Sequence, residues 1–236
     1  VTGTATNTEE NKAFYQGLAN TWANDYKDAA IVVFAREGGE GHDLLMDDVD
    51  TDGSTISSLA LHKDERDLLE MVRKDFDKVI VLLNSPYQME VQDIIPYADS
   101  ILFIGYPGHQ GFTGVAEILK GTVNPSGHLV DTWAADFTAN PAFYNFGTGV
   151  GPDATDKYDG SLNYSVDYEE GIYVGYRYYE TRGFTDGEEW YRQNVVYPFG
   201  HGLSYTTFDW AVKAPSASEI TEDGVICLLY TSDAAD

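Results

Sequence analysis

The first half of the chain alternates short apolar runs with longer stretches of helical periodicity. Three runs, at 31–34, 79–83 and 101–104, are apolar without alternation, which is typical of strands buried on both faces of a parallel sheet. Apolar residues recur at helical spacing in four other segments: 8–27, 64–76, 89–95 and 111–119. Strands that alternate with helices predict right-handed crossovers. The expected fold class is α/β, a doubly wound and mostly parallel sheet.

The pattern breaks near residue 136. Residues 136–207 carry many Tyr, Gly and Asp with little periodicity, so we expect a long irregular Tyr-rich extension. Tyrosines at 168–181 are suited either to stacking on sugars or to covering a core with their hydroxyls in water. From residue 208 to 226 the chain is expected to begin an all-β domain. The predicted divisions are therefore 1–135 for the α/β domain, 136–207 for its extension and 208–226 for the β start.

The last ten residues, CLLYTSDAAD at 227–236, resemble the translation of an adapter used in sequencing libraries. We therefore predict that they are not native and leave them out of the fold. The alternative is a genuine terminal strand.

Charge narrows the range of partners. The net charge of -25 argues against binding to nucleic acid or to anionic lipid, because both are repelled within a Debye length. A neutral ligand meets no such barrier. The single cysteine, Cys227, excludes an internal disulfide framework and a Cys-based zinc site.

The polar loops that follow the three apolar runs are the candidate site. In open α/β sheets, ligands bind outside the carboxyl ends of the strands, and the loops leaving those ends are 36–43, 84–86 and 105–111. In the first of them, Glu40 is surrounded by glycines. Backbone without side chains can carry a carboxyl into a cleft, as a proton donor requires. Alternatively, Glu40 pairs with Arg36 or caps a turn.

Two other interpretations of this region fit less well. A phosphate-binding loop is disfavoured because the glycines do not match GxGxxG and Glu40 would face the phosphates with a negative charge. Asp48, Asp50, Asp52 and Gly53 match the first half of a calcium loop, but its twelfth position is Leu59 rather than a carboxylate. A solvated acidic loop is the better interpretation. The histidines lie far apart, so we expect no metal site and no cofactor.

Four blocks carry a family resemblance. They are DAAIVVFAREGGEGHD (28–43), GYPGHQGFTGVAEILKGTVNPSGHL (105–129), YEEGIYVGYRYYET (168–181) and VVYPFGHGLSYTTF (195–208). In this order they resemble the carboxy-terminal α/β-sandwich domain of glycoside hydrolase family 3, the β-glucosidase type. The last block resembles the lead-in to a fibronectin-III-like domain, of which 208–226 is then the truncated start.

The resemblance implies a retaining glycosidase acting on β-glycosides of the glucoside or xyloside type. In that family the nucleophile, an Asp, lies on a (β/α)8 barrel that precedes the sandwich, so this chain begins inside the domain and lacks the nucleophile. By resemblance Glu40 is the general acid/base, with a pKa raised by a neighbouring carboxylate and partial burial. Arg36 and Asp43 are predicted to bind substrate or support the loop. Leu44, which follows Asp43, stands where members of the family usually carry a basic residue.

A second hypothesis is a non-catalytic carbohydrate-binding or scaffold module with the same fold. The sequence upstream of the chain distinguishes the two hypotheses. A barrel with a nucleophile segment there supports the enzyme, and a start codon just before Val1 supports the module. As an enzyme fragment carrying one of two carboxyls, the chain alone is expected to be inactive.

Overall fold

A computed structural model describes residues 8–38, 44, 48–144, 168, 170–219, 221–222, 224–227 and 229–234. The chain divides into two compact units. The first combines residues 1–111 with 129–201, and the second combines residues 112–128 with 202–236. We describe each unit by itself.

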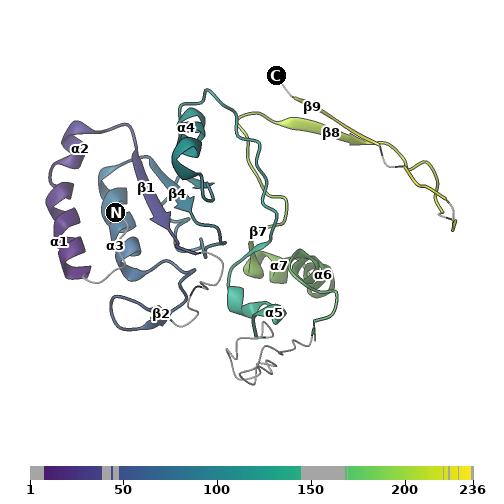
Figure 1. The fold of residues 1–236 in the computed structure, drawn as a ribbon, viewed down its shortest axis with the longest axis horizontal. Coiled ribbons are helices and arrows are strands. Elements are labelled where there is room, and N and C mark those ends of the chain that lie inside the picture. Colours follow the sequence, from purple (N-terminus) through teal and green to yellow (C-terminus); the bar gives the residue numbers. More distant parts are fainter. Residues whose placement is uncertain are drawn as a thin grey trace. The chain divides into compact units, whose positions relative to one another are not determined.

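A three-stranded parallel sheet forms the centre of the first unit (Figure 1). Its order is β1-β4-β5, with β1 at Ala30–Ala35, β4 at Val79–Asn84 and β5 at Ser100–Phe103. In the parallel register Val32 lies opposite Val81, and Val81 lies opposite Ile101. The three predicted strands are thus confirmed to within one residue at each end, and so is the α/β class with a parallel sheet flanked by helices. The expectation of burial on both faces is wrong for β1 and β5, because Ile31 and Val33 of β1 and Phe103 of β5 are exposed.

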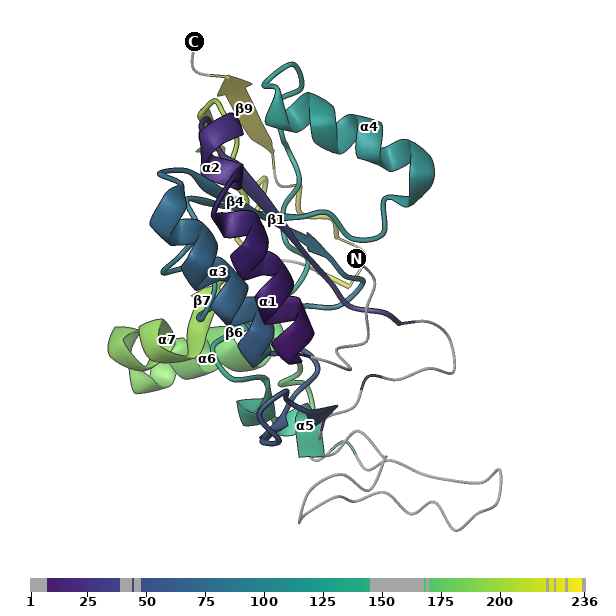
Figure 2. The ribbon, with the colours of Figure 1, turned by 90° about the vertical axis from the view of Figure 1, so that its left-hand side faces the viewer.

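Helices α1 (Thr8–Ala19) and α3 (Lys63–Asp75) lie side by side on one face of this sheet (Figure 2). Their face of the sheet carries the main core, because inward side chains recur at every second position. Its fully buried aliphatic members include Val81 and Leu83 on β4 and Leu69 on α3. The cluster comprises Val32, Phe34, Leu61, Leu69, Val72, Phe76, Val79, Val81, Leu83, Met89, Val91, Ile94 and Trp133.

Two predicted helices differ from the structure. The segment 8–27 contains a break, because the N–H of Thr21 turns back to Leu18 O, and a short α2 (Trp22–Asp25) follows. The segment 89–95 forms hydrogen-bonded turns rather than a helix. Pro96 has no N–H to donate and disfavours helical geometry at the residue before it, so the turns do not propagate.

A small hairpin separates the sheet from α3. Strands β2 (Asp48–Val49) and β3 (Thr55–Ile56) are antiparallel, and Gly53 takes a positive φ of 85° in the turn between them. Gly53 N–H also donates to Asp50 O at 2.9 Å, which closes the turn. The hairpin connects the candidate loop to α3.

The remainder of the first unit is built around a second, aromatic cluster. The two-residue strand β6 (Trp133–Ala134) pairs with β7 (Val195–Tyr197), between which lie α5 (Pro141–Tyr144), α6 (Tyr176–Asp186) and α7 (Glu188–Asn194). The prediction of an irregular extension over 136–207 is therefore wrong for α6 and α7. Their sequence has little amphipathic pattern, and packing of aromatic rings specifies them instead. The predicted domain boundaries stay predictions.

The second unit contains most of α4 (Gly108–Leu119) and the ribbon of β8 (Phe208–Val212) and β9 (Tyr230–Ala234). Asn124 joins its two chain segments, since Oδ1 accepts from the Tyr205 N–H at 2.8 Å and Nδ2 donates to Thr206 Oγ1 at 2.9 Å. The ribbon is antiparallel and β8 is exposed along its whole length. The statement that residues 227–236 are not native stays a prediction.

In the part of the chain that the structure describes, no helix is long and apolar enough to span a membrane.

Candidate functional site at the carboxyl ends of the sheet

The segments that leave β1, β4 and β5 meet at one edge of the sheet, as predicted. Tyr106, which follows β5, donates its hydroxyl to Arg36 O at 2.8 Å. Tyr87, which follows β4, lies against the backbone of Gly38. The beginning of the candidate loop therefore contacts two tyrosines, one from the segment after β4 and one from the segment after β5.

Gly38 is required by this close approach. A Cβ added at Gly38 would lie 2.3 to 2.7 Å from the ring and hydroxyl atoms of Tyr87, closer than non-bonded atoms are found. Any side chain at position 38 would displace Tyr87 or the loop. Of the glycines near Glu40, Gly38 thus has a packing reason that is visible in the structure.

Arg36 is buried and uses all of its donors within the protein. Its Nη atoms donate to Glu65 Oε1 and Oε2, each at 2.7 Å, and to the carbonyls of Ala35 at 3.0 Å and Ala60 at 2.7 Å. Its Nε donates to Ser58 O. Since a guanidinium has five N–H groups, each has an acceptor. The two parallel bonds to one carboxylate form a bidentate pair of the stronger kind.

Glu65 belongs to the first turn of α3. Besides Arg36, its Oε2 accepts from the N–H of His62 at 3.0 Å, one of the donors that a helix start leaves without an intrahelical partner. The negative charge also lies at the positive end of the helix dipole. Glu65 therefore fastens the base of the candidate loop to the start of α3.

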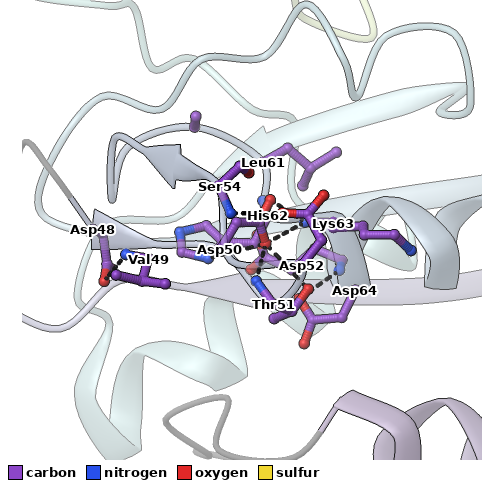
Figure 3. A network of polar contacts seen from close by, with 12 residues as sticks. Asp48, Val49, Asp50, Thr51, Asp52, Ser54, Leu61, His62, Lys63 and Asp64 are labelled. Carbon is purple, nitrogen blue, oxygen red and sulfur yellow. Dashed lines mark hydrogen bonds and ion pairs between the residues drawn. The ribbon is translucent and has the colours of Figure 1, made fainter.

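The chain that returns from the candidate loop is fastened at the same place (Figure 3). Asp50 is buried, with 6% of its surface exposed, and accepts from the N–H of Lys63 at 3.0 Å (Oδ1) and 3.1 Å (Oδ2). Its Oδ1 also accepts from the N–H of Thr51 at 2.7 Å. Asp48 Oδ2 accepts from Ser58 Oγ at 3.0 Å. Asp50 and Glu65 thus both hold the amino end of α3.

These contacts explain the half calcium motif. The carboxylates of Asp48, Asp50 and Asp52 each accept hydrogen bonds from nearby N–H groups, and bonds from Ser54 hold the pKa of Asp52 below its usual value. Within the described ranges no group of three or more His, Cys, Asp or Glu is placed to hold a metal. The interpretation of a solvated acidic loop is wrong for Asp50, whose carboxylate is buried because it caps α3.

Glu40 and Asp43, the predicted acid/base and its loop partner, lie outside the described residues. Their roles stay predictions. Of the three residues predicted for the site, only Arg36 is described. Its guanidinium faces Glu65 and the carbonyls around it, which suits support of the loop rather than contact with a substrate.

An aromatic hollow lies apart from the sheet edge. Its volume is about 320 Å³, and its wall includes Tyr173, Tyr178, Arg182 and Glu170. Tyr179, the next residue along α6, is buried instead, and burial raises the pKa of its hydroxyl to about 12. The tyrosines of this segment therefore divide between a core and an open surface.

Sequence reasoning missed the polar residues that organise the loop ends. Ser58, Glu65, Tyr87 and Tyr106 come from four different segments, so no local spacing connects them. One signal was present. Glu65 stands three residues after His62, the spacing at which a helix's third residue returns a bond to the N-cap backbone.

Comparisons with known proteins agree with this architecture. Residues 17–176 match the profile of the glycosyl hydrolase family 3 C-terminal domain. Thermostable beta-glucosidase B of Acetivibrio thermocellus is 30% identical over 214 residues, covering 86% of this chain and 25% of the relative. Beta-glucosidase A of Butyrivibrio fibrisolvens is 36% identical over 221 residues, covering 84% of this chain and 24% of the relative.

Solved structures give the same result. Beta-glucosidase 3B from Thermotoga neapolitana, in complex with α-D-glucose, superposes with a TM-score of 0.68 at 32% identity, covering 94% of this chain and 27% of that one. A beta-glucosidase from Paenibacillus barengoltzii gives a TM-score of 0.67 at 31% identity, covering 89% and 20%. The chain spans about a quarter or less of the lengths of these proteins. It belongs to glycoside hydrolase family 3, and residues 17–176 correspond to the C-terminal domain of that family.

Proposed function

We propose that the chain is part of a retaining β-glycosidase, of the β-glucosidase or β-xylosidase type, to which it contributes the general acid/base Glu40. The observation that carries this proposal is the position of the loop. It leaves the carboxyl end of β1 beside the segments after β4 and β5, at the sheet edge where α/β domains bind ligands. The relatives, all named as beta-glucosidases, support the substrate class.

The chemistry requires two carboxyl groups on opposite sides of the scissile bond. In a retaining mechanism they lie roughly 5–5.5 Å apart, one attacking the sugar and the other protonating the leaving oxygen and later activating water. Glu40 takes the second role. The nucleophile then comes from a preceding barrel domain of the same protein. The length of the relatives is consistent with this, because the match covers only 25% of thermostable beta-glucosidase B.

Arg36 supports the loop in this proposal and does not bind the sugar. Its five N–H groups already have acceptors, and its charge is balanced by Glu65. Glu40 therefore has no free guanidinium donor at position 36 to pair with, which leaves its proton available for transfer. Asp43 is assigned to the loop on its position alone.

A leaving-group comparison in the full-length enzyme tests the role of Glu40. Glu40→Gln should lower kcat/KM for cellobiose by about 10²- to 10⁴-fold, the usual contribution of a general acid. The loss should be much smaller for a dinitrophenyl glucoside, because its leaving group needs no proton. Glu37→Gln, a neighbouring carboxylate, is the matched control and should change both substrates little. Equal losses on both substrates in Glu40→Gln contradict the assignment.

In this proposal the 236-residue chain by itself should show no turnover of aryl glycosides, because of the two carboxyls it supplies only Glu40. Measurable hydrolysis by the purified chain would contradict the proposal that two domains each supply one of the carboxyls. The stereochemistry of the product, followed by NMR, would show whether that hydrolysis is retaining.

The aromatic hollow favours a second function, carbohydrate binding without catalysis. Tyr173, which is 47% exposed, supplies an aromatic surface for a sugar there. Cellobiose titrated into the isolated chain, followed by NMR, should then shift signals that Tyr173→Ala abolishes. Tyr168→Ala, at an exposed tyrosine outside the hollow, is the control. Absence of binding leaves catalysis as the function of the domain.

A further inference from the structure

One buried serine contacts both ends of the candidate loop. The carbonyl of Ser58 accepts from Arg36 Nε at the start of the loop. Its hydroxyl donates to Asp48 Oδ2 at 3.0 Å, where the chain returns from the loop. With 5% of its surface exposed, Ser58 makes both contacts away from water. It therefore joins the residues on either side of 37–47.

Both ends are also fastened to α3. Arg36 is held by the bidentate bonds to Glu65, and the hairpin that contains Asp48 is held by Asp50, which caps the N–H of Lys63. The two anchors belong to the first three residues of one helix. The ends of the loop consequently share a rigid reference, whereas anchors on separate elements would move independently.

How accurately the loop ends are held matters for catalysis. A general acid must reach the leaving oxygen within about 3 Å, and a misplacement of 1 Å can lower the rate about 10²-fold. Helices hold such groups more accurately than loops do, provided that supporting hydrogen bonds lock the connection. Ser58 supplies the bond between the two loop ends, through Arg36 and Asp48. Glu65 and Asp50 connect those ends to the start of α3.

We propose that Ser58, Glu65 and Asp50 are positioning residues that set the place of Glu40 by closing its loop on the start of α3. This inference rests on the proposed function, because it assumes that Glu40 transfers the proton. It assigns no contact with substrate to the three residues. They act through the two ends of the loop.

The test in the full-length enzyme compares two adjacent serines. Ser58→Ala removes the hydroxyl that reaches Asp48, while Ser57→Ala removes a hydroxyl that only accepts from the N–H of Leu59. Ser58→Ala should lower kcat/KM for cellobiose about 10-fold while changing that for a dinitrophenyl glucoside less than about 2-fold. Ser57→Ala should change neither. The loss of kcat/KM for cellobiose should be larger in Glu65→Gln than in Ser58→Ala, because an amide donor would then face Arg36.

A second measurement does not depend on activity. In the 236-residue chain, amide hydrogen exchange in peptides covering 37–47 should be at least about 5-fold faster in Ser58→Ala and Glu65→Gln than in the unaltered chain. Exchange in peptides covering β4 should not change. The same rates in 37–47 for Ser58→Ala and Ser57→Ala overturn the inference.

The outcomes separate the two proposals. If Glu40→Gln lowers kcat/KM equally for both substrates, the proposed function fails whatever the result for Ser58→Ala. If Glu40→Gln lowers kcat/KM selectively for cellobiose but Ser58→Ala has the same effect as Ser57→Ala, the positioning inference alone fails. A loss in Ser58→Ala that is equal for both substrates and accompanied by a lower Tm also overturns it, because it indicates a purely structural role.

Discussion

The first unit contains two cores that are built on different principles. Around β4 the core is mainly aliphatic, with Leu83 and Leu69 fully buried beside Phe34, Phe76 and Trp133. Around α6 and α7 it is aromatic and partly open, with Trp190 against Tyr179 and the guanidinium of Arg182 4.6 Å from the Trp190 ring centre. The first cluster gains stability from apolar area removed from water, and the second depends more on ring geometry and on charge.

This difference has a practical consequence. Burial of aliphatic area responds little to salt or pH, whereas cation–π contacts, ion pairs and buried hydroxyls respond to both. The two regions should therefore separate when conditions or side chains are changed.

The largest expected effect comes from comparing two phenylalanines. Phe34 has 3% of its surface exposed in the aliphatic core, and Phe184 on α6 has 92%. Phe34→Ala should lower the free energy of unfolding by about 3–5 kcal/mol, because it leaves a cavity. Phe184→Ala should change it by less than about 0.5 kcal/mol. Denaturant unfolding measures both, and similar losses would mean that the two regions do not differ in this way.

A pair of arginines probes the aromatic region. Arg182 stacks on Trp190, donates to the hydroxyl of Tyr178 at 2.9 Å and pairs with Asp186, so Arg182→Ala should cost about 1–2 kcal/mol. Arg192, with its side chain 65% exposed, forms surface ion pairs with Glu188 and Glu189, and Arg192→Ala should cost less than about 0.5 kcal/mol. Denaturant unfolding followed by circular dichroism compares them. Equal costs would show that ring stacking adds nothing.

Alkaline pH should weaken the aromatic region through Tyr179. Burial raises the pKa of its hydroxyl from 10.0 to about 12, so the neutral phenol favours the folded state. That contribution is fully present below pH 10 and is lost as the pH rises to 12. Tyr179→Phe should therefore lose less stability than the unaltered protein between pH 10 and pH 12. Parallel pH profiles of Tm for the two proteins would contradict this.

The smallest effect is expected at Glu90, where the two regions touch. Burial first, and then Asp136 and Asp93, raise the pKa of Glu90, although the N–H of Phe137 opposes this at 3.4 Å. A raised carboxyl pKa means that stability is present below the usual pKa of 4.5 and is lost as the pH rises through the folded-state value.

Glu90→Gln should therefore stabilise the protein at pH 7 by less than about 1 kcal/mol, since solvent screens a half-exposed group. The gain should disappear below pH 4. A variant that is less stable than the unaltered protein at pH 7 would show that the bond to Phe137 outweighs burial.

The sheet was predictable from sequence because its strands are short apolar runs with no polar alternation. Val79–Asn84 is buried on both faces, and few other structures accept such a run. The helices α6 and α7 were not predictable in the same way. Tyr179 and Trp190 stabilise them through contacts across the chain, and a local pattern carries no record of such contacts.

The candidate site was predictable in position but not in its supports. The carboxyl ends of parallel strands share an edge, so the convergence of the loops followed from topology. The surrounding glycines singled out Glu40, and the resemblance assigned it the role of general acid/base. The partners of Arg36 could not be predicted, because Ser58 and Glu65 lie 22 and 29 residues further along the chain.

The contacts of Ser58 also bear on how the domain tolerates change. When the two ends of a segment are fixed to one another and to a helix, its interior can be lengthened, shortened or replaced without moving the sheet or α3. We therefore expect the segment between Gly38 and Asp48 to accept replacements and changes of length. A graft there should leave the fold around it the same.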